Sequence, residues 1–221
     1  MMFRLVGALS ILFVTALSAC STSRQEVTPG SGVVVASWYG PDFHGRPTSS
    51  GEIFNMYSLT CAHRAYPFGT ILKVTNTANK KTVECIVNDR GPFVEGRDLD
   101  LSYAAAKEIG VTGPGTGRVF VEVNGRDSSY IRKVRVQAVG KTGPFAVQVG
   151  SFSESINAIR LKKALNLKYG NVYIQEAEIK GSNYYRVRVG NFDVMSGALS
   201  TAEQLGQEGY PALVVKADLK I

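Results

Sequence analysis

Histidine and cysteine are scarce in this chain of 221 residues, which holds two histidines and three cysteines. No CxxC or HxxxH spacing occurs among them, so the sequence predicts no metal site, and we expect no cofactor. Long apolar runs are also missing, because the run from Leu5 to Ala19 is shorter than the roughly 20 residues that a membrane-spanning helix needs. The whole chain is 44% hydrophobic and holds 23 glycines, 10 tyrosines and 10 phenylalanines. This composition excludes a disordered chain and favours a β-rich globular fold.

The N-terminal segment has the pattern of an export signal. Arg4 precedes the apolar run, and the run ends at Leu17-Ser18-Ala19-Cys20. This ending resembles a bacterial lipobox, which implies that residues 1–19 are a cleaved signal peptide and that Cys20 carries lipid. Ser21 resembles the residue that directs such lipoproteins to the outer membrane, where the protein would face the periplasm. An ordinary signal peptide with an incidental cysteine is the alternative.

Positive charge exceeds negative charge, with 25 lysines and arginines against 18 acidic residues and a net charge of +7. Removal of residues 1–19 takes away only Arg4, so the balance stays positive. The excess favours an anionic partner. For an exported protein this means peptidoglycan carboxylates and lipid headgroups rather than nucleic acid.

Composition and periodicity divide the remainder of the chain. Residues 20–32 are polar and indicate a flexible tether. Between residues 33 and 125, a short helix at Tyr103–Glu108, capped by Ser102 and followed by Gly110, interrupts runs of strand type. The predicted strands are 33–39, 58–62, 70–76, 82–87 and 118–124. Several short strands with one small helix indicate a compact barrel.

A repeat marks a second domain at residues 144–221. The hexapeptide VQVGSF at 147–152 returns as VRVGNF at 187–192, and each copy precedes a helical stretch (154–169; 194–207) and a strand (172–179; 212–216). Two βαβ units predict a four-stranded antiparallel sheet with both helices on one face, the ferredoxin-like arrangement. Alternation directs the valines of each hexapeptide to the core and leaves the other face as a binding candidate or as a merely solvated surface. The connection at 126–143 is a short linker, so the two domains should be less independent than domains joined by a long linker.

Two family resemblances follow from these motifs. Residues 144–215, with the opening PFAVQVGSF, resemble a SPOR domain, a module that binds peptidoglycan glycan strands without stem peptides. Residues 36–101 resemble the double-psi β-barrel of the rare lipoprotein A family. The motifs that carry this second resemblance are ASWYG (36–40), FHGR (43–46), TSSGE (48–52), AH (62–63), PFGT (67–70), NDRGPF (88–93) and DLS (100–102). The fold expected is therefore mainly β plus α+β, a double-psi β-barrel followed by a ferredoxin-like SPOR domain.

The resemblance implies a lytic transglycosylase that cleaves the bond between N-acetylmuramic acid and N-acetylglucosamine at the division septum. One carboxylic acid protonates the glycosidic oxygen and then takes the proton of the muramoyl 6-hydroxyl, which closes a 1,6-anhydro ring. The carried-over residues are Asp89 as acid/base, with Glu52 and His63 as orienting and charge-stabilising partners. From local sequence alone, these three are also typical of a turn-capping aspartate, an exposed loop glutamate and a structural histidine.

Further residues are expected at the binding surfaces. The groove candidates are Tyr39, His44, Arg46 and Arg90, and Trp38 is either a groove wall or barrel core. The candidates on the SPOR sheet face are Gln148, Ser151, Tyr184, Arg186 and Arg188. The partners expected are peptide-free glycan, the membrane through Cys20, and a septal amidase or divisome proteins.

Two features differ from the usual family pattern. Asn55 stands where relatives often have aspartate, which removes a carboxylate from the expected groove. Cys61 and Cys85 are an even pair in an oxidising compartment if Cys20 is lipidated, so we expect a disulfide between them. A septal glycan-binding lipoprotein without catalysis is the main alternative function. An RNA-binding sheet is a weaker one, because the sheet face lacks the expected aromatic pair and the export signal contradicts it.

Overall fold

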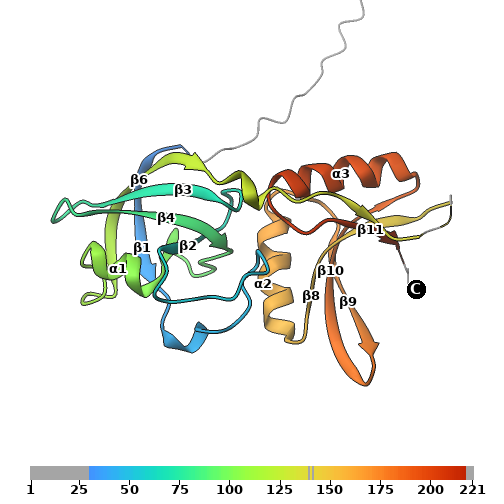
Figure 1. Cartoon of the computed structure of the whole chain (residues 1–221), viewed down its shortest axis with the longest axis horizontal. Helices are drawn as coiled ribbons and strands as arrows, with labels where there is room; N and C mark the ends of the chain where they lie inside the picture. Colours follow the sequence, from blue (N-terminus) through green and yellow to red (C-terminus); the bar gives the residue numbers. More distant parts are fainter. Residues whose placement is uncertain (1–29, 139, 141, 218–221) are drawn as a thin grey trace, which may run out of the picture.

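The computed structural model describes residues 30–138, 140 and 142–217. The expected signal peptide, the lipidated Cys20 and most of the tether lie outside these residues. The chain forms a barrel domain followed by a sheet-and-helix domain (Figure 1). Among the helices that the structure describes, none is long and apolar enough to cross a lipid bilayer.

The barrel domain is a closed barrel of six strands, with the strand order β1-β5-β2-β4-β3-β6 and β1 paired with β6. Two of its pairings, β1 with β5 and β2 with β4, are parallel. Its elements are β1 (Gly32–Trp38), η1 (Pro41–Phe43), β2 (Thr60–His63), β3 (Thr70–Asn76), β4 (Thr82–Asp89), β5 (Leu99–Leu101), α1 (Tyr103–Glu108) and β6 (Thr116–Arg126). Closure removes the unpaired strand edges that an open sheet would expose.

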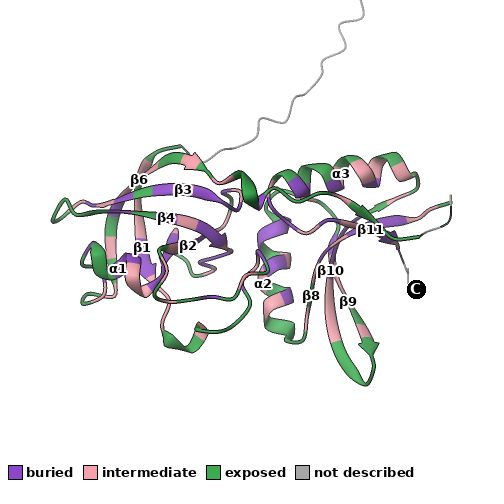
Figure 2. Ribbon diagram, viewed as in Figure 1, coloured by how far each residue is buried: buried purple, intermediate pink, exposed green. Residues whose placement is uncertain are grey.

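Alternating side chains fill the barrel. Leu72 and Val74 of β3, and Val83, Cys85 and Val87 of β4, are buried, whereas Lys73, Glu84 and Ile86 between them are more exposed. Figure 2 shows the buried residues along the barrel strands and on the inner faces of the helices. At the start of α1, the Ser102 hydroxyl accepts a hydrogen bond from the Ala105 N–H at 3.2 Å, as the capping pattern predicts.

The second domain is a sheet with the order β7-β11-β8-β10-β9. Its elements are β7 (Arg135–Val136), β8 (Phe145–Phe152), α2 (Ser155–Asn166), β9 (Val172–Ile179), β10 (Ser182–Phe192), α3 (Met195–Gln207) and β11 (Leu213–Lys216). The four strands of the repeat have the ferredoxin-like order and pair antiparallel. The sheet has five strands rather than the four expected, because β7 pairs with β11 in parallel. Thus part of the segment 126–143 is structured: it contains η2 (Ser128–Tyr130) and β7.

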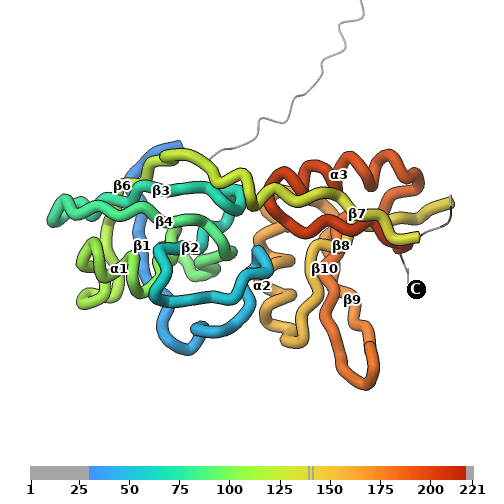
Figure 3. The backbone as a smooth tube through the Cα atoms, in the orientation of Figure 1, coloured from blue at the N-terminus to red at the C-terminus, as the bar shows by residue number. Residues whose placement is uncertain are grey.

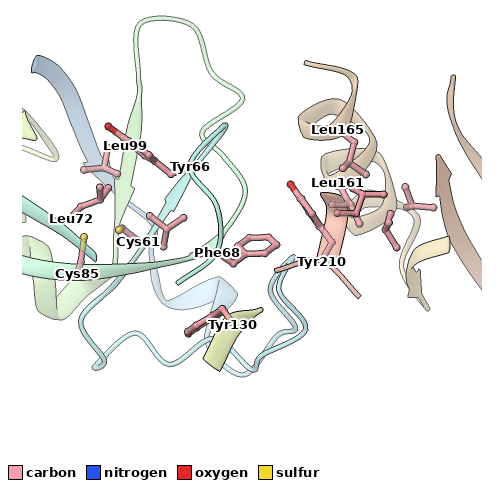
Figure 4. Packing of buried hydrophobic residues seen from close by; sticks show 14 of the residues in the cluster. Cys61, Tyr66, Phe68, Leu72, Cys85, Leu99, Tyr130, Leu161, Leu165 and Tyr210 are labelled. Atoms are coloured by element: carbon pink, nitrogen blue, oxygen red, sulfur yellow. The ribbon is translucent and has the colours of Figure 1, made fainter. Parts of the chain in front are cut away.

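The two domains share one hydrophobic core, as the short connection predicted. Phe68 of the barrel meets Tyr210 of the second domain edge to face, with ring centroids 4.9 Å apart. Figure 4 shows the Phe68 and Tyr210 rings between the barrel residues and Leu161 and Leu165 of α2. The Phe68 N–H also donates to the Glu208 carbonyl at 2.9 Å.

Two glycines allow this close approach. A Cβ at Gly206 would lie 2.4 Å from the Arg132 carbonyl oxygen. Gly209 has a φ of +92°, and a Cβ there would lie 2.9 Å from the Cβ of Phe68. The backbone continues this junction, because the Arg132 N–H donates to the Gly206 carbonyl at 2.9 Å. The relative position of the domains is therefore fixed by tight packing and not by the linker alone.

Candidate active site

One row of residues crosses four neighbouring barrel strands. Asp89 of β4 is paired with Ala62 of β2, Ala62 with Asp100 of β5, and Asp100 with Ser37 of β1. Residues paired in this way point to the same side of the sheet. The two aspartates are thus two strand spacings apart, or ~9.5 Å between their Cα atoms, with only the methyl group of Ala62 between them.

Asp89 is a partly buried carboxyl group with fixed hydrogen bonds. Its Oδ1 accepts from the Ser49 N–H at 2.8 Å and from its neighbour's N–H, that of Arg90, at 2.7 Å. Burial raises the pKa of Asp89 above its ordinary value, while these hydrogen bonds and the Arg90 charge act in the opposite direction. A raised pKa suits a group that must donate a proton and later take one back.

Asp100 is the second carboxyl group of the row. It accepts a short hydrogen bond from the Ser37 hydroxyl, and its Oδ2 lies 3.5 Å from Nη2 of Arg97. Burial raises the pKa of Asp100, and the Ser37 hydroxyl and the Arg97 charge limit the rise. Asp100 was not among the predicted site residues, although it stands in the motif DLS, and Ser37 stands in the motif ASWYG.

An open cleft of about 320 Å³ lies over this row. It runs along the loop that follows Asp89, Gly91 to Val94, and along the aromatic residues at the end of β1. The side chains that matter for chemistry in its lining are Asp89, Asp100, Trp38, Tyr39, Arg97 and Arg160. A smaller pocket adjoins it and shares Tyr39, Phe43, Asp89 and Arg160 with it. The lining assigns Trp38 to the cleft wall, where its ring also meets that of Tyr103 at 5.6 Å.

Of the predicted groove residues, Tyr39, Arg46 and Arg90 line these cavities. The Tyr39 ring lies against Phe54, with centroids 4.3 Å apart, and burial together with the nearby Asp89 charge raises the pKa of Tyr39. Arg46 is exposed and forms a 3.7 Å ion pair with Glu154. His44 is exposed at the base of the loop and accepts the Met56 N–H at 3.2 Å; it does not line either cavity.

Arg90 is part of the lining of the larger cleft, but most of the residue is buried. Only 4% of the residue is exposed, and its guanidinium carbon lies 3.6 Å from the centroid of the Phe68 ring. Its Nε donates to the Tyr210 hydroxyl at 2.5 Å, and its Nη1 to the His63 carbonyl at 3.3 Å. Through these contacts Arg90 joins the two domains at the edge of the cleft. Sequence could not reveal this, because Tyr210 lies 120 positions away.

Glu52 and His63 are not brought to the carboxyl row. Glu52 accepts a hydrogen bond from the Asn88 amide at 2.8 Å, and its charge helps to raise the pKa of Tyr130. Asn88 and Asp89 are adjacent on one strand, so their side chains alternate. His63 accepts the N–H groups of Ala65 and Tyr66 at 3.1 Å each.

The environment of His63 keeps its imidazole neutral. Burial, followed by the charges of Arg90 and Arg64, lowers the pKa of His63 to about 3. A neutral ring whose Nδ1 accepts two backbone hydrogen bonds orders the turn after β2. Neither Glu52 nor His63 lines the two cavities described above. Their predicted roles in catalysis therefore require an action through neighbouring residues.

The sheet face opposite α2 and α3 holds the predicted glycan residues of the second domain. Val147, Val149, Val187 and Val189 are buried, as the alternation predicted. On the opposite face, Gln148, Tyr184 and Arg186 are partly exposed, and Ser151 is exposed at the end of the strand.

Arg188 was expected on the open face but is 2% exposed. It lies in a cross-strand row with Gln148 and Tyr173, and its Nη1 donates to the Lys216 carbonyl at 3.2 Å. In the sheet, β10 lies between β8 and β9, so Arg188 has a neighbouring strand on both sides, which the alternation pattern alone does not show.

Cys61 and Cys85 are buried free thiols, so the expected disulfide is absent from the structure. Both lie in the barrel core (Figure 4). The two thiols are nevertheless neighbours: burial, a hydrogen bond to the Cys85 side chain and the Cys85 charge raise the pKa of the Cys61 thiol. Cys61 stands on β2 and Cys85 on the parallel strand β4.

Comparisons with known proteins agree with the two-domain pattern. A family model described as "Lytic transglycolase" matches residues 31–121, and a SPOR domain model matches residues 141–216. Together with the closed barrel and the helix-backed sheet, these matches define the class: a double-psi barrel of the lytic transglycosylase type joined to a SPOR domain.

Curated relatives specify the family. The endolytic peptidoglycan transglycosylase RlpA of Vibrio cholerae is 40% identical over 181 residues, which cover 82% of this chain and 67% of the relative. The proteins of the same name from Campylobacter jejuni and Helicobacter pylori strain J99 are 43% and 36% identical, and the chain spans about half of their lengths (50% and 52%). The chain belongs to the rare lipoprotein A family.

Proposed function

We propose that this protein is an endolytic lytic transglycosylase that cleaves peptidoglycan glycan strands between N-acetylmuramic acid and N-acetylglucosamine. The observation that carries the proposal is Asp89: a carboxyl group with a raised pKa, fixed by two backbone hydrogen bonds, at the floor of an open cleft. The family membership and the names of its relatives support the same reaction.

One acid is sufficient for this chemistry. Protonated Asp89 gives its proton to the glycosidic oxygen as the bond from that oxygen to C1 of the muramoyl residue breaks. The Asp89 carboxylate then takes the proton of the 6-hydroxyl, and the 6-oxygen forms the new bond to C1. No water is consumed, and one strand ends in a 1,6-anhydro ring. Because Asp89 Oδ1 already accepts two hydrogen bonds, Oδ2 is the atom that carries the proton.

Asp100 has the position of a second carboxylate in the reaction. In the transition state, positive charge develops on the muramoyl ring, and a nearby carboxylate stabilises it. The Arg97 ion pair and the Ser37 hydroxyl favour the ionised form of Asp100, whereas Asp89 has no comparable ion pair among the described residues. The two aspartates therefore have different tasks, Asp89 as acid and base and Asp100 as a fixed charge.

The remaining expectations about place and partners belong to the same proposal. The SPOR sheet face, with Gln148, Tyr184 and Arg186, binds glycan from which stem peptides have been removed and so brings the barrel to the septum. Residues 1–19 are cleaved and Cys20 is lipidated, which anchors the protein to the outer membrane in the periplasm. A septal amidase supplies the peptide-free strands. The support for these statements is the sequence motifs.

The proposal is tested by incubating the purified chain with peptide-free sacculi and analysing the released fragments by mass spectrometry. Fragments with 1,6-anhydromuramoyl ends support it, and Asp89→Asn should release none above background. Asp100→Asn should also lose activity, because the amide carries no charge. If wild-type protein binds the sacculi but releases no fragment while a known lytic enzyme does, the protein is a glycan-binding lipoprotein without catalysis.

A further inference from the structure

The second domain contributes a wall to the catalytic cleft. Arg160 and Asn157 of α2 line the pocket beside Asp89, and Arg160 also lines the larger cleft over the carboxyl row. Figure 3 shows α2 between the barrel and the SPOR sheet, beside the loop that contains η1. The cleft is thus built by both domains, and the opposite side of α2 packs into the core through Leu161 and Leu165.

Two contacts hold α2 against the barrel loop. Glu154, which precedes the helix, forms the 3.7 Å ion pair with Arg46, and the guanidinium carbon of Arg160 lies 5.0 Å from the centroid of the Phe43 ring. The enclosed Arg90 and its bond to Tyr210 fix the domains at the other side of the junction. Arg160 is therefore held at the cleft by the fold, and its position does not depend on a mobile linker.

Among the described residues, Arg160 has no anionic partner within ion-pair distance. The other cleft guanidinium groups are occupied: Arg97 pairs with Asp100, Arg46 with Glu154, and Arg90 is enclosed by Phe68 and Tyr210. Within the part of the chain that the structure describes, Arg160 makes no hydrogen bond or ion pair, and its guanidinium lies over the Phe43 ring. A partly buried guanidinium in a cleft is suited to bind a carboxylate of a ligand.

We propose that Arg160 of the SPOR domain forms a carboxylate subsite in the catalytic cleft and binds the lactyl carboxylate of a peptide-free muramoyl residue. This inference rests on the proposed function and adds a specificity device to it. Hydrolysis of the amide that joins a stem peptide to the lactyl group leaves a carboxylate, whereas a strand with its peptide has a neutral amide there. Arg160 thus distinguishes the two strands by charge, next to the acid that cleaves the bond.

The test compares two substrates and three variants. The substrates are peptide-free glycan strands with free lactyl carboxylates and the same strands with those groups converted to methylamides. The variants are Arg160→Gln, Arg160→Lys and the matched control Lys163→Gln, which removes an exposed charge from the same helix. We expect wild-type kcat/KM to be about 10- to 100-fold higher for the carboxylate substrate.

In Arg160→Gln, kcat/KM for the carboxylate substrate should fall by that same 10- to 100-fold and should then equal kcat/KM for the methylamide substrate. Arg160→Lys should keep part of the preference, and Lys163→Gln all of it. An unchanged preference in Arg160→Gln overturns the inference while leaving the proposed function intact. Wild-type protein that cleaves neither substrate overturns the proposed function instead. Calorimetry of a carboxylate-bearing tetrasaccharide with Asp89→Asn, alone and combined with Arg160→Gln, then decides the subsite without turnover, and equal affinities reject it.

Discussion

Replacing Tyr210 by phenylalanine removes one oxygen atom from the contact between the two domains. The Tyr210 hydroxyl accepts the Arg90 Nε–H at 2.5 Å, and the arginine is buried with its guanidinium over Phe68. The variant keeps the ring and its contact with Phe68 but leaves a buried charged donor with one partner fewer. A hydrogen bond to a charged group contributes about 1.5–3 kcal/mol to the free energy of unfolding. For a chain of this size, that corresponds to a fall in the melting temperature of roughly 3–12 °C.

Two spectroscopic signals can follow the two domains separately. Trp38 is the single tryptophan and lies in the barrel, so its fluorescence reports barrel unfolding. The longer helices, α2 with 12 residues and α3 with 13, lie in the SPOR domain, so circular dichroism at helical wavelengths reports mainly that domain. Because the two domains share one core, both signals should change at one midpoint in the wild type, and both midpoints should fall together in Tyr210→Phe.

The control is Tyr57→Phe, which removes a hydroxyl from a side chain in an exposed position of the barrel loop. Its melting temperature should be that of the wild type, because exposed substitutions usually change stability by less than about 0.5 kcal/mol. A shift below ~1 °C in Tyr210→Phe, or a shift confined to one of the two signals, would refute the conclusion that this bond couples the domains.

Three further predictions follow from the site and the sheet face. Asp89→Asn should lower kcat by about 100-fold or more. The raised pKa of folded Asp89 means that its ionised form destabilises the folded state at a pH above the pKa of the unfolded chain. Because the amide oxygen of the variant can keep both backbone hydrogen bonds, the melting temperature of Asp89→Asn at neutral pH should equal or exceed that of the wild type. His63 has a pKa of about 3 in the folded state, below its value of 6.5 in the unfolded chain. Its contribution to stability is therefore present above pH 6.5 and is lost as the pH falls toward 3. His63→Asn keeps a hydrogen-bond acceptor, so its melting temperature in calorimetric scans should fall less steeply with acidic pH than that of the wild type. Combined replacement of Gln148 and Arg186 by alanine should abolish retention on peptide-free sacculi without changing the melting temperature, and unchanged retention would place glycan binding elsewhere.

Helices and strands were predicted well where neighbouring residues determine them. The helix Tyr103–Glu108, the strand Thr70–Asn76 and the strand Val172–Ile179 have the predicted bounds. Capping, alternation and the internal repeat are properties of neighbouring residues, and the physical forces that act on them are equally local. The strand β5 was missed because three residues cannot display a periodicity.

Contacts between segments that lie far apart in the sequence could not be predicted from local patterns. Arg90 and Tyr210 meet across the domain junction, and Arg160 reaches the cleft of another domain. The burial of Arg188 depends on the strands β8 and β9 that flank β10, and the register of Cys61 against Val87 depends on the pairing of β2 with β4. Resemblance to a family supplied Asp89, but only the pairing of Asp89, Ala62 and Asp100 shows which carboxyl groups share the cleft.

The central claim is that Asp89 drives an internal transfer within the sugar and not an attack by water. The most direct measurement is cleavage of peptide-free glycan in water enriched in heavy oxygen, with mass spectrometry of the new muramoyl ends. Transglycosylation predicts that the wild type forms 1,6-anhydro ends that carry no heavy oxygen from the solvent. Asp89→Asn should form no such ends. Reducing ends that carry the heavy oxygen, formed at the wild-type rate, would contradict the account.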